Sequence, residues 1–157
     1  MYQTILLPTD GTSGTKQVAE RAFDLATKYD ATIQALNAIL DVHPEGSGDL
    51  EEHTLGVDLG NLRADLEEKG QATVAEIDAW ADEAGVPCVT DVVIGGPPDE
   101  AILEYADEHD VDVIVMGTHG RTGLARWLGG SVAEDVVRHA EIPVLSVRLP
   151  EPEPENQ

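Results

Sequence analysis

Short runs of apolar residues alternate along the chain with longer segments in which apolar residues recur every three or four positions. The short runs predict buried β-strands, and the longer segments predict amphipathic helices. Strands are expected at 3–8, 31–40, 86–94, 111–116 and 143–148, and helices at 13–29, 59–85, 99–109 and 131–140.

Three segments interrupt this alternation. Residues 41–56 are polar and rich in glycine, which predicts a long loop. Gly70 lies inside the second helical segment, where we expect a kink or a break. Residues 149–157 include a Pro-Glu repeat and are expected to fray. We therefore place one domain at 1–149 and a disordered acidic tail at 150–157.

Strict alternation of strand and helix predicts right-handed βαβ units that form one parallel sheet with helices on both faces. A length of 157 residues corresponds to one domain of this three-layer α/β kind. In such sheets, ligands bind beyond the carboxyl ends of the strands, at the point where the strand order reverses. The loops that follow the strands are therefore the places to look for chemistry.

A glycine-rich segment follows the fourth strand and ends at the start of a helix. It contains Gly117, Gly120, Gly130 and Ser131. Glycines let backbone N–H groups approach phosphate oxygens closely, and the first turn of a helix offers unpaired N–H donors. The hydroxyl of Ser131 suits either a helix cap or a phosphate. This pattern predicts an anion site.

The distribution of charge supports the same segment. The chain has 31 acidic and nine basic residues, yet 113–133 contains no acid over 21 positions and carries Arg121 and Arg126. At this acid content, such a gap at a chosen place arises by chance about once in a hundred. Arg126 suits either the anion site or an ordinary surface position.

The net charge of −22 changes the expected partners and environment. Such a field repels nucleic acid and anionic membranes, so we expect neither as a partner. The acids are dispersed over the chain, which favours adaptation to concentrated salt, where screening acts within about 3 Å. A single cysteine and an N-terminus without a signal-peptide pattern predict a cytoplasmic protein.

The spacing G-x2-G-x9-G-[ST] at Gly117, Gly120, Gly130 and Ser131 resembles the ATP-binding signature of universal stress proteins. It would occur by accident in roughly one such chain in a hundred. Residues 5–11 are similar to the family's first strand and turn, and 142–145 are similar to its last strand. The resemblance covers about residues 2–149.

The resemblance implies a Rossmann-like fold of the adenine nucleotide α-hydrolase-like type, with five parallel strands in the order 3-2-1-4-5. It also implies ATP as the ligand, with Mg²⁺ on its phosphates near Asp10, although Asp10 could instead cap the first helix or its turn. The implied ligand-contacting residues are Pro8, Thr9 and Asp10 at the adenosine, Ala38 at the adenine through its backbone, and Gly117, Gly120, Arg121, Gly130, Ser131, Val132 and Ala133 around the phosphates.

The predicted function is therefore an ATP-binding stress-response or regulatory protein. No catalytic residues and no metal-ligand spacing emerge from the sequence. The alternative is an enzyme of the same superfamily with slow ATP hydrolysis or nucleotidyl or phosphoryl transfer. Val144, Leu145 and Val147 would leave an apolar edge on the last strand, which together with the resemblance predicts a homodimer through that strand.

Overall fold

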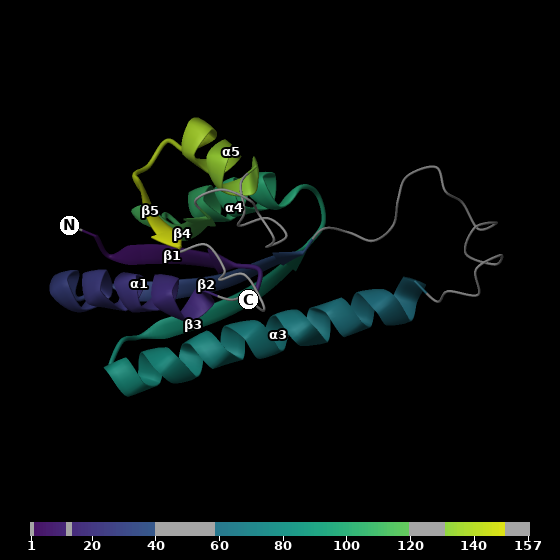
Figure 1. Ribbon diagram of the computed structural model, residues 1–157, viewed down its shortest axis with the longest axis horizontal. Helices are drawn as coiled ribbons and strands as arrows, with labels where there is room; N and C mark the ends of the chain where they lie inside the picture. Colours follow the sequence, from purple (N-terminus) through teal and green to yellow (C-terminus); the bar gives the residue numbers. More distant parts are fainter. Residues whose placement is uncertain (1, 12–13, 40–58, 120–130, 150–157) are drawn as a thin grey trace, which may run out of the picture.

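A computed structural model describes residues 2–11, 14–39, 59–119 and 131–149, without the side chains of 59, 60, 119 and 131. Strands and helices alternate throughout these segments (Figure 1). The strands are β1 (Thr4–Thr9), β2 (Thr32–Ile39), β3 (Cys88–Ile94), β4 (Val113–His119) and β5 (Val144–Leu149). The helices are α1 (Thr15–Tyr29), α3 (Leu59–Ala84), α4 (Pro98–Glu108) and α5 (Ser131–His139).

The five strands form one parallel sheet in the order β3-β2-β1-β4-β5. Helices α1 and α3 cover one face, and α4 and α5 cover the other (Figure 1). The predicted Rossmann-like three-layer α/β fold and its strand order are confirmed. The strand order reverses between β1 and β4, because β2 and β3 lie on one side of β1 and β4 and β5 lie on the other. The ligand region is therefore expected at the carboxyl ends of β1 and β4.

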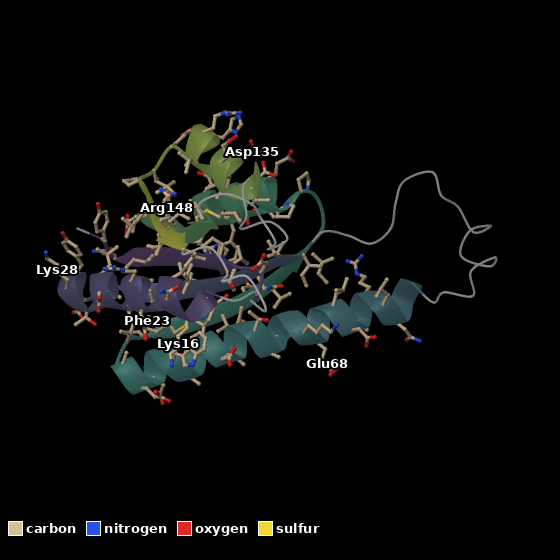
Figure 2. All side chains as sticks on the ribbon, in the orientation of Figure 1. Lys16, Phe23, Lys28, Glu68, Asp135 and Arg148 are labelled. Carbon is tan, nitrogen blue, oxygen red and sulfur yellow. The ribbon has the colours of Figure 1, made fainter. Side chains whose placement is uncertain are left out.

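Alternation along the strands builds two cores. Ile5 and Leu7 of β1 face α1 and α3, whereas Leu6 faces α4 and α5. All three side chains are fully buried because helices cover both faces of the sheet. On α1, Phe23 packs into the first core, and on α3, Glu68 projects away from the sheet (Figure 2).

A carboxylate ties the beginnings of the two central strands together. Asp112 Oδ2 accepts hydrogen bonds from the backbone N–H groups of Gln3 and Thr4, at 2.8 and 3.0 Å. These residues are more than a hundred positions apart in the chain, so the contact helps to fix the pairing of β1 with β4.

Helix α3 runs without a break through Gly70, so the predicted kink is wrong. A Cβ on Gly70 would lie 2.8 Å from Asn37 Oδ1 and 3.2 Å from both Ile39 Cδ1 and Val92 Cγ1. Glycine is therefore at this position because the helix approaches β2 and β3 closely. With 26 residues, α3 is about 39 Å long and extends past the carboxyl ends of the strands (Figure 1).

The fourth and fifth strands end later in the chain than predicted. Gly117 belongs to β4 and pairs with Val147, and Leu149 belongs to β5 and is only 2% exposed. The expectation that Leu149 begins a frayed tail is thus wrong. A Cβ on Gly14 would lie 2.7 Å from Leu149 Cδ1, and one on Gly117 would lie 3.1 Å from the same atom. Leu149 is buried because two glycines leave room for it.

No helix in the part of the chain that the structure describes is long and apolar enough to cross a membrane.

The burial of Leu149 makes the end of β5 part of the core. We expect Leu149→Ala to lower the free energy of unfolding by about 2–5 kcal/mol, as for other buried leucines. The control is Leu62→Ala, since Leu62 is 40% exposed. Urea unfolding at constant KCl is the suitable measurement, because an ionic denaturant would also change the screening of the acidic surface. Equal losses for the two variants would contradict the assignment.

Candidate functional site

A cavity of about 450 Å³ lies at the carboxyl ends of β1 and β2. Its walls come from these two strand ends, from the middle of α3, and from the first turns of α4 and α5. The lining residues are Asp10, Asn37, Ala38, Ile39, Leu66, Lys69, Gly70, Thr73, Pro98 and Val132. Cavities of this size hold ligands the size of a nucleotide or a drug.

The wall between β2 and α3 depends on a buried amide. Asn37 is 6% exposed, and its Nδ2 donates to the backbone carbonyl of Thr9 at 3.0 Å. Thr9 and Asn37 are register partners in the pairing of β1 with β2. This bond continues the pairing of the strands through a side chain and holds Asn37 against Gly70 on α3.

The turn after β1 places Asp10 in the cavity wall. Thr9 Oγ1 accepts from the N–H of Gly11 at 3.0 Å and shares a 3.1 Å hydrogen bond with Thr15 Oγ1. Gly11 has a φ of 79°, and a Cβ there would lie 2.9 Å from Thr73 Oγ1, so this tight turn favours glycine. Gly14 occupies the N-cap position of α1, so Asp10 is not the helix cap that the sequence left open.

The cavity combines an apolar wall with a small set of polar groups. Ala38, Ile39 and Leu66 supply apolar surface, and Asp10 supplies a carboxylate that is 5% exposed. Lys69 is the cationic side chain among the described lining residues. On α3 it directly follows Glu68, which points outward, so the cation and the acid lie on different sides of the helix (Figure 2).

The first turn of α5 reaches the cavity through Val132. Backbone N–H groups in the first turn of a helix lack partners within the helix, and the helix dipole adds partial positive charge there. This turn of α5 and the Lys69 side chain on α3 are the parts of the lining that suit an anion.

The structure brings only part of the predicted site together. Asp10, Ala38 and Val132 line the cavity. Pro8 and Thr9 are buried at the end of β1, and Ala133 is buried in the first turn of α5. Ser131 begins α5. Gly120, Arg121, Arg126 and Gly130 lie outside the described residues.

Gly117 has a packing environment that the motif does not predict. A Cβ there would lie 2.8 Å from Val18 Cγ2, so Gly117 permits the close approach of α1 to β4. Its position in the strand is compatible with the motif because β4 adjoins the point where the strand order reverses.

Sequence reasoning missed Asn37, Lys69, Gly70 and Thr73 as lining residues. Two signals were available in retrospect: Asn37 is a polar residue within a buried strand, and Lys69 is one of only three lysines in the chain. Gly70 gave a third signal, but a glycine within a helical pattern indicates a kink as readily as a close approach.

Among the residues that the structure describes, two side chains have shifted pKa values, and both lie outside this cavity. Burial, with a smaller contribution from Asp78, raises the pKa of the Cys88 thiol to about 11. Burial, followed by the charge of Asp91, raises the pKa of Tyr105 to about 12. Both shifts keep the groups protonated near neutral pH, so neither is an activated nucleophile.

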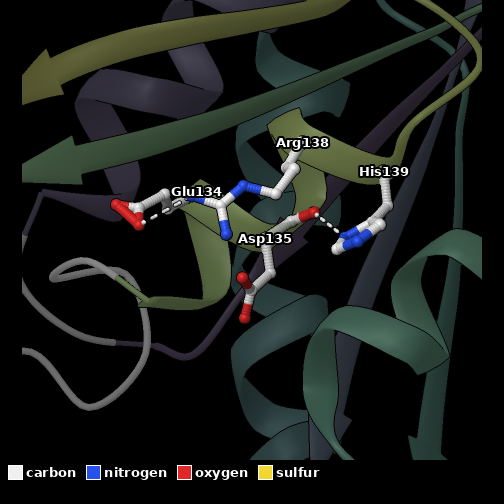
Figure 3. A network of polar contacts seen from close by, with 4 residues as sticks. All are labelled: Glu134, Asp135, Arg138 and His139. Atoms are coloured by element: carbon white, nitrogen blue, oxygen red, sulfur yellow. Dashed lines mark hydrogen bonds and ion pairs between the residues drawn. The ribbon is translucent and has the colours of Figure 1, made fainter.

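The outer face of α5 carries charges of both signs (Figure 3). Arg138 Nη2 lies 3.6 Å from Glu134 Oε1, and His139 Nδ1 lies 3.0 Å from the backbone oxygen of Asp135. The ion pair is largely exposed and contributes little to stability. The acid near the start of the helix and the bases at its end suit the helix dipole.

The fold and the cavity define a class: doubly wound α/β domains with a ligand cavity at the carboxyl edge of the sheet. The sequence profile of the Universal stress protein family matches residues 1–148. Universal stress protein MJ0531 of Methanocaldococcus jannaschii is 38% identical over 159 residues, covering 98% of this chain and 86% of that protein. The chain therefore belongs to the universal stress protein family.

Solved structures agree with this assignment. The structure of MJ0577 matches with a TM-score of 0.75 at 27% identity, over 97% of this chain and 99% of that one. A universal stress protein in complex with cAMP matches with a TM-score of 0.64 at 25% identity, over 94% and 97% of the two chains. One from Archaeoglobus fulgidus in complex with dAMP has the same fold, with a TM-score of 0.65 at 20% identity over 93% and 98%.

The close contact at Gly70 predicts that replacing this glycine by alanine lowers the free energy of unfolding, opposite to the usual effect in a helix. Glycine to alanine within a helix normally stabilises by about 1 kcal/mol. Here the new methyl group would meet the buried Asn37 and the partly buried Ile39 side chains, and overpacking costs about 1–3 kcal/mol. We expect Gly70→Ala to lower the free energy of unfolding in urea.

Ala72→Gly calibrates the same helix, because Ala72 is exposed. It is expected to cost about 1 kcal/mol from helix propensity alone. A gain in stability for Gly70→Ala of the size that Ala72→Gly loses would show that Gly70 is an ordinary helix residue.

Proposed function

We propose that this universal stress protein binds ATP in the cavity at the carboxyl ends of β1 and β2 and acts as a stress-response regulator. One observation supports the proposal above the others: Asp10, Ala38 and Val132, selected from the sequence, line a single cavity of suitable size. The cAMP and dAMP complexes of related folds give further support, since both ligands are adenine nucleotides.

The lining chemistry suits the parts of a nucleotide. A carboxylate such as Asp10 is a good acceptor for ribose hydroxyls. The backbone of Ala38, with Pro8 and Thr9 beside it, would contact the adenosine. The phosphates would be held by Gly117, Gly120, Arg121, Gly130, Ser131, Val132 and Ala133. When Mg²⁺ is bound to the phosphates, it neutralises part of their charge, and Asp10 is the nearby hard oxygen ligand.

The charge of the chain makes local cations important. A net charge of −22 opposes the approach of a triphosphate, whereas the acid-free segment 113–133 and Lys69 oppose that repulsion locally. In our proposal the acidic surface is an adaptation to a salt-rich cytoplasm, where screening limits the repulsion to short range. The functional domain is 1–149, with 150–157 as an acidic tail.

The proposed assembly is a homodimer through β5. This strand is an edge of the sheet, and its Leu145 is 43% exposed. Unpaired backbone groups and exposed apolar side chains on an edge strand favour pairing with a second chain. A two-fold axis along this edge would cover both.

Nucleotide binding is tested in two ways. Any nucleotide that co-purifies with the protein is extracted and identified, and ATP is titrated into the protein in KCl by calorimetry. We expect bound adenine nucleotide and measurable heat. Following ADP release in the same incubation with Mg²⁺ separates the binding protein from the superfamily enzyme: intact ATP supports the former, and sustained turnover supports the latter. The absence of both co-purified nucleotide and heat would contradict the proposal.

Lys69→Gln is expected to weaken ATP binding by about threefold to tenfold, which corresponds to roughly 1 kcal/mol for one nearby charge. Binding of adenosine, which lacks phosphates, should change much less, and raising KCl should reduce the difference for ATP. The matched control is Lys16→Gln: Lys16 Nζ lies 5.5 Å from the Trp80 ring and does not line the cavity. Equal effects of the two variants on ATP affinity would remove Lys69 from the site.

The dimer is tested by light scattering at micromolar concentration in molar KCl. Wild type should have twice the chain mass, and Leu145→Asp should shift it toward the monomer because a charge would be buried between the paired strands. The control is Val89→Asp on β3, the opposite edge strand, where Val89 is 49% exposed. A monomeric wild type, or dissociation by Val89→Asp alone, would contradict pairing through β5.

A further inference from the structure

A buried amide in the cavity wall has an acceptor that no described residue uses. Asn37 lines the cavity and is 6% exposed. Its Nδ2 donates to the Thr9 carbonyl, and because a carbonyl oxygen can only accept, this bond determines which end of the amide is nitrogen. Among the residues that the structure describes, none donates to Asn37 Oδ1.

The position of Oδ1 follows from its nearest neighbours. It lies 2.8 Å from the point that a Cβ of Gly70 would occupy, and Ile39 Cδ1 and Val92 Cγ1 lie 3.2 Å from the same point. Gly70 also lines the cavity, so Oδ1 lies against a residue of the cavity wall. Oδ1 is thus a fixed acceptor beside the apolar atoms of Ile39 and Val92, where an unsatisfied polar atom is costly.

We propose that Asn37 is a base-selecting residue whose Oδ1 accepts an N–H from the exocyclic amino group of adenine. The proposal rests on the proposed nucleotide-binding function. It explains why a buried acceptor is kept in an apolar wall: it pairs only when the correct base enters. A base with a carbonyl at the same position would place two acceptors face to face, which is unfavourable.

The surroundings favour the base over the ribose as the partner of Asn37. Ile39, Leu66 and Pro98 supply apolar surface to the same cavity, which suits a flat aromatic ring. Ribose hydroxyls require several polar partners, and the Asp10 carboxylate is the acceptor that suits them. Asn37 is therefore assigned to the base and Asp10 to the sugar.

Wild-type protein provides the first test, by calorimetric titration with ATP, purine riboside triphosphate and inosine triphosphate in KCl. Purine riboside triphosphate lacks the amino group, and inosine triphosphate carries a carbonyl in its place. We expect ATP to bind at least about tenfold more tightly than either analogue, because a site built around a hydrogen bond discriminates against ligands that lack it. Equal affinities would overturn the role of Asn37, whereas no binding of any nucleotide would overturn the proposed function itself.

Two alanine variants on the same strand provide the second test. Asn37→Ala should bring the affinity ratio of ATP to purine riboside triphosphate close to one. The control is Gln34→Ala: Gln34 Oε1 accepts from Tyr105 Oη at 3.0 Å, so it also loses one side-chain hydrogen bond, but it does not line the cavity. Gln34→Ala should keep the wild-type ratio. Persistence of the ratio in a folded Asn37→Ala would overturn the proposal.

Titrations with 2′-deoxy-ATP and 3′-deoxy-ATP separate the base from the sugar. Asn37→Ala should lose the same affinity as wild type when ATP is replaced by either deoxy analogue. If Asn37→Ala no longer distinguishes ATP from the deoxy analogues but still prefers ATP over purine riboside triphosphate, the assignment of Asn37 to the base is overturned. Circular dichroism checks folding. If Asn37→Ala does not fold, Asn37→Leu, which has a similar volume and no acceptor, is titrated in its place: a ratio close to one supports the proposal, and the wild-type ratio contradicts it.

Discussion

The close packing of α3 against β2 at Gly70 is the contact on which the cavity depends. A long helix covers the sheet edge and continues past the ends of the strands, so it becomes a wall of the ligand region as well as a core element. That wall can form only where the helix has no side chain, since Asn37, Ile39 and Val92 occupy the space that a Cβ would need. The Asn37–Thr9 hydrogen bond then joins this wall to the central strand β1.

Much of the fold could be predicted from the sequence because its signals are local and repeated. Alternation of apolar runs with helical periodicity identified every described element. The strand order came from the resemblance to universal stress proteins, because alternation predicts a parallel sheet but does not determine the order of its strands. The errors concern contacts between distant segments. Neither the continuous helix at Gly70 nor the burial of Leu149 can be inferred from neighbouring residues alone.

The candidate site shows the same division. Asp10, Ala38 and Val132 could be named from the sequence because the resemblance to universal stress proteins implies them, and they adjoin strand ends or a helix start, where parallel sheets bind ligands. Asn37, Lys69 and the α3 wall could not, because a helix residue gives no local sign of which loop it will face. For Lys69 the available indication was the scarcity of lysine, because in so acidic a chain each lysine has a large effect on the local electrostatic potential.

Small residues also couple the edge of the sheet to the ligand region. Leu149, at the end of β5, packs into space left by Gly14 at the start of α1 and by Gly117 in β4. Gly117 in turn permits the approach of Val18 on α1, so one cluster joins β5, β4 and α1. Displacing β5 would disturb this cluster, because protein interiors have little free volume in which to absorb a shift. The edge proposed for dimer contact and the strand that leads into the glycine motif are therefore parts of one packed unit, and a change at either is expected to be felt at the other.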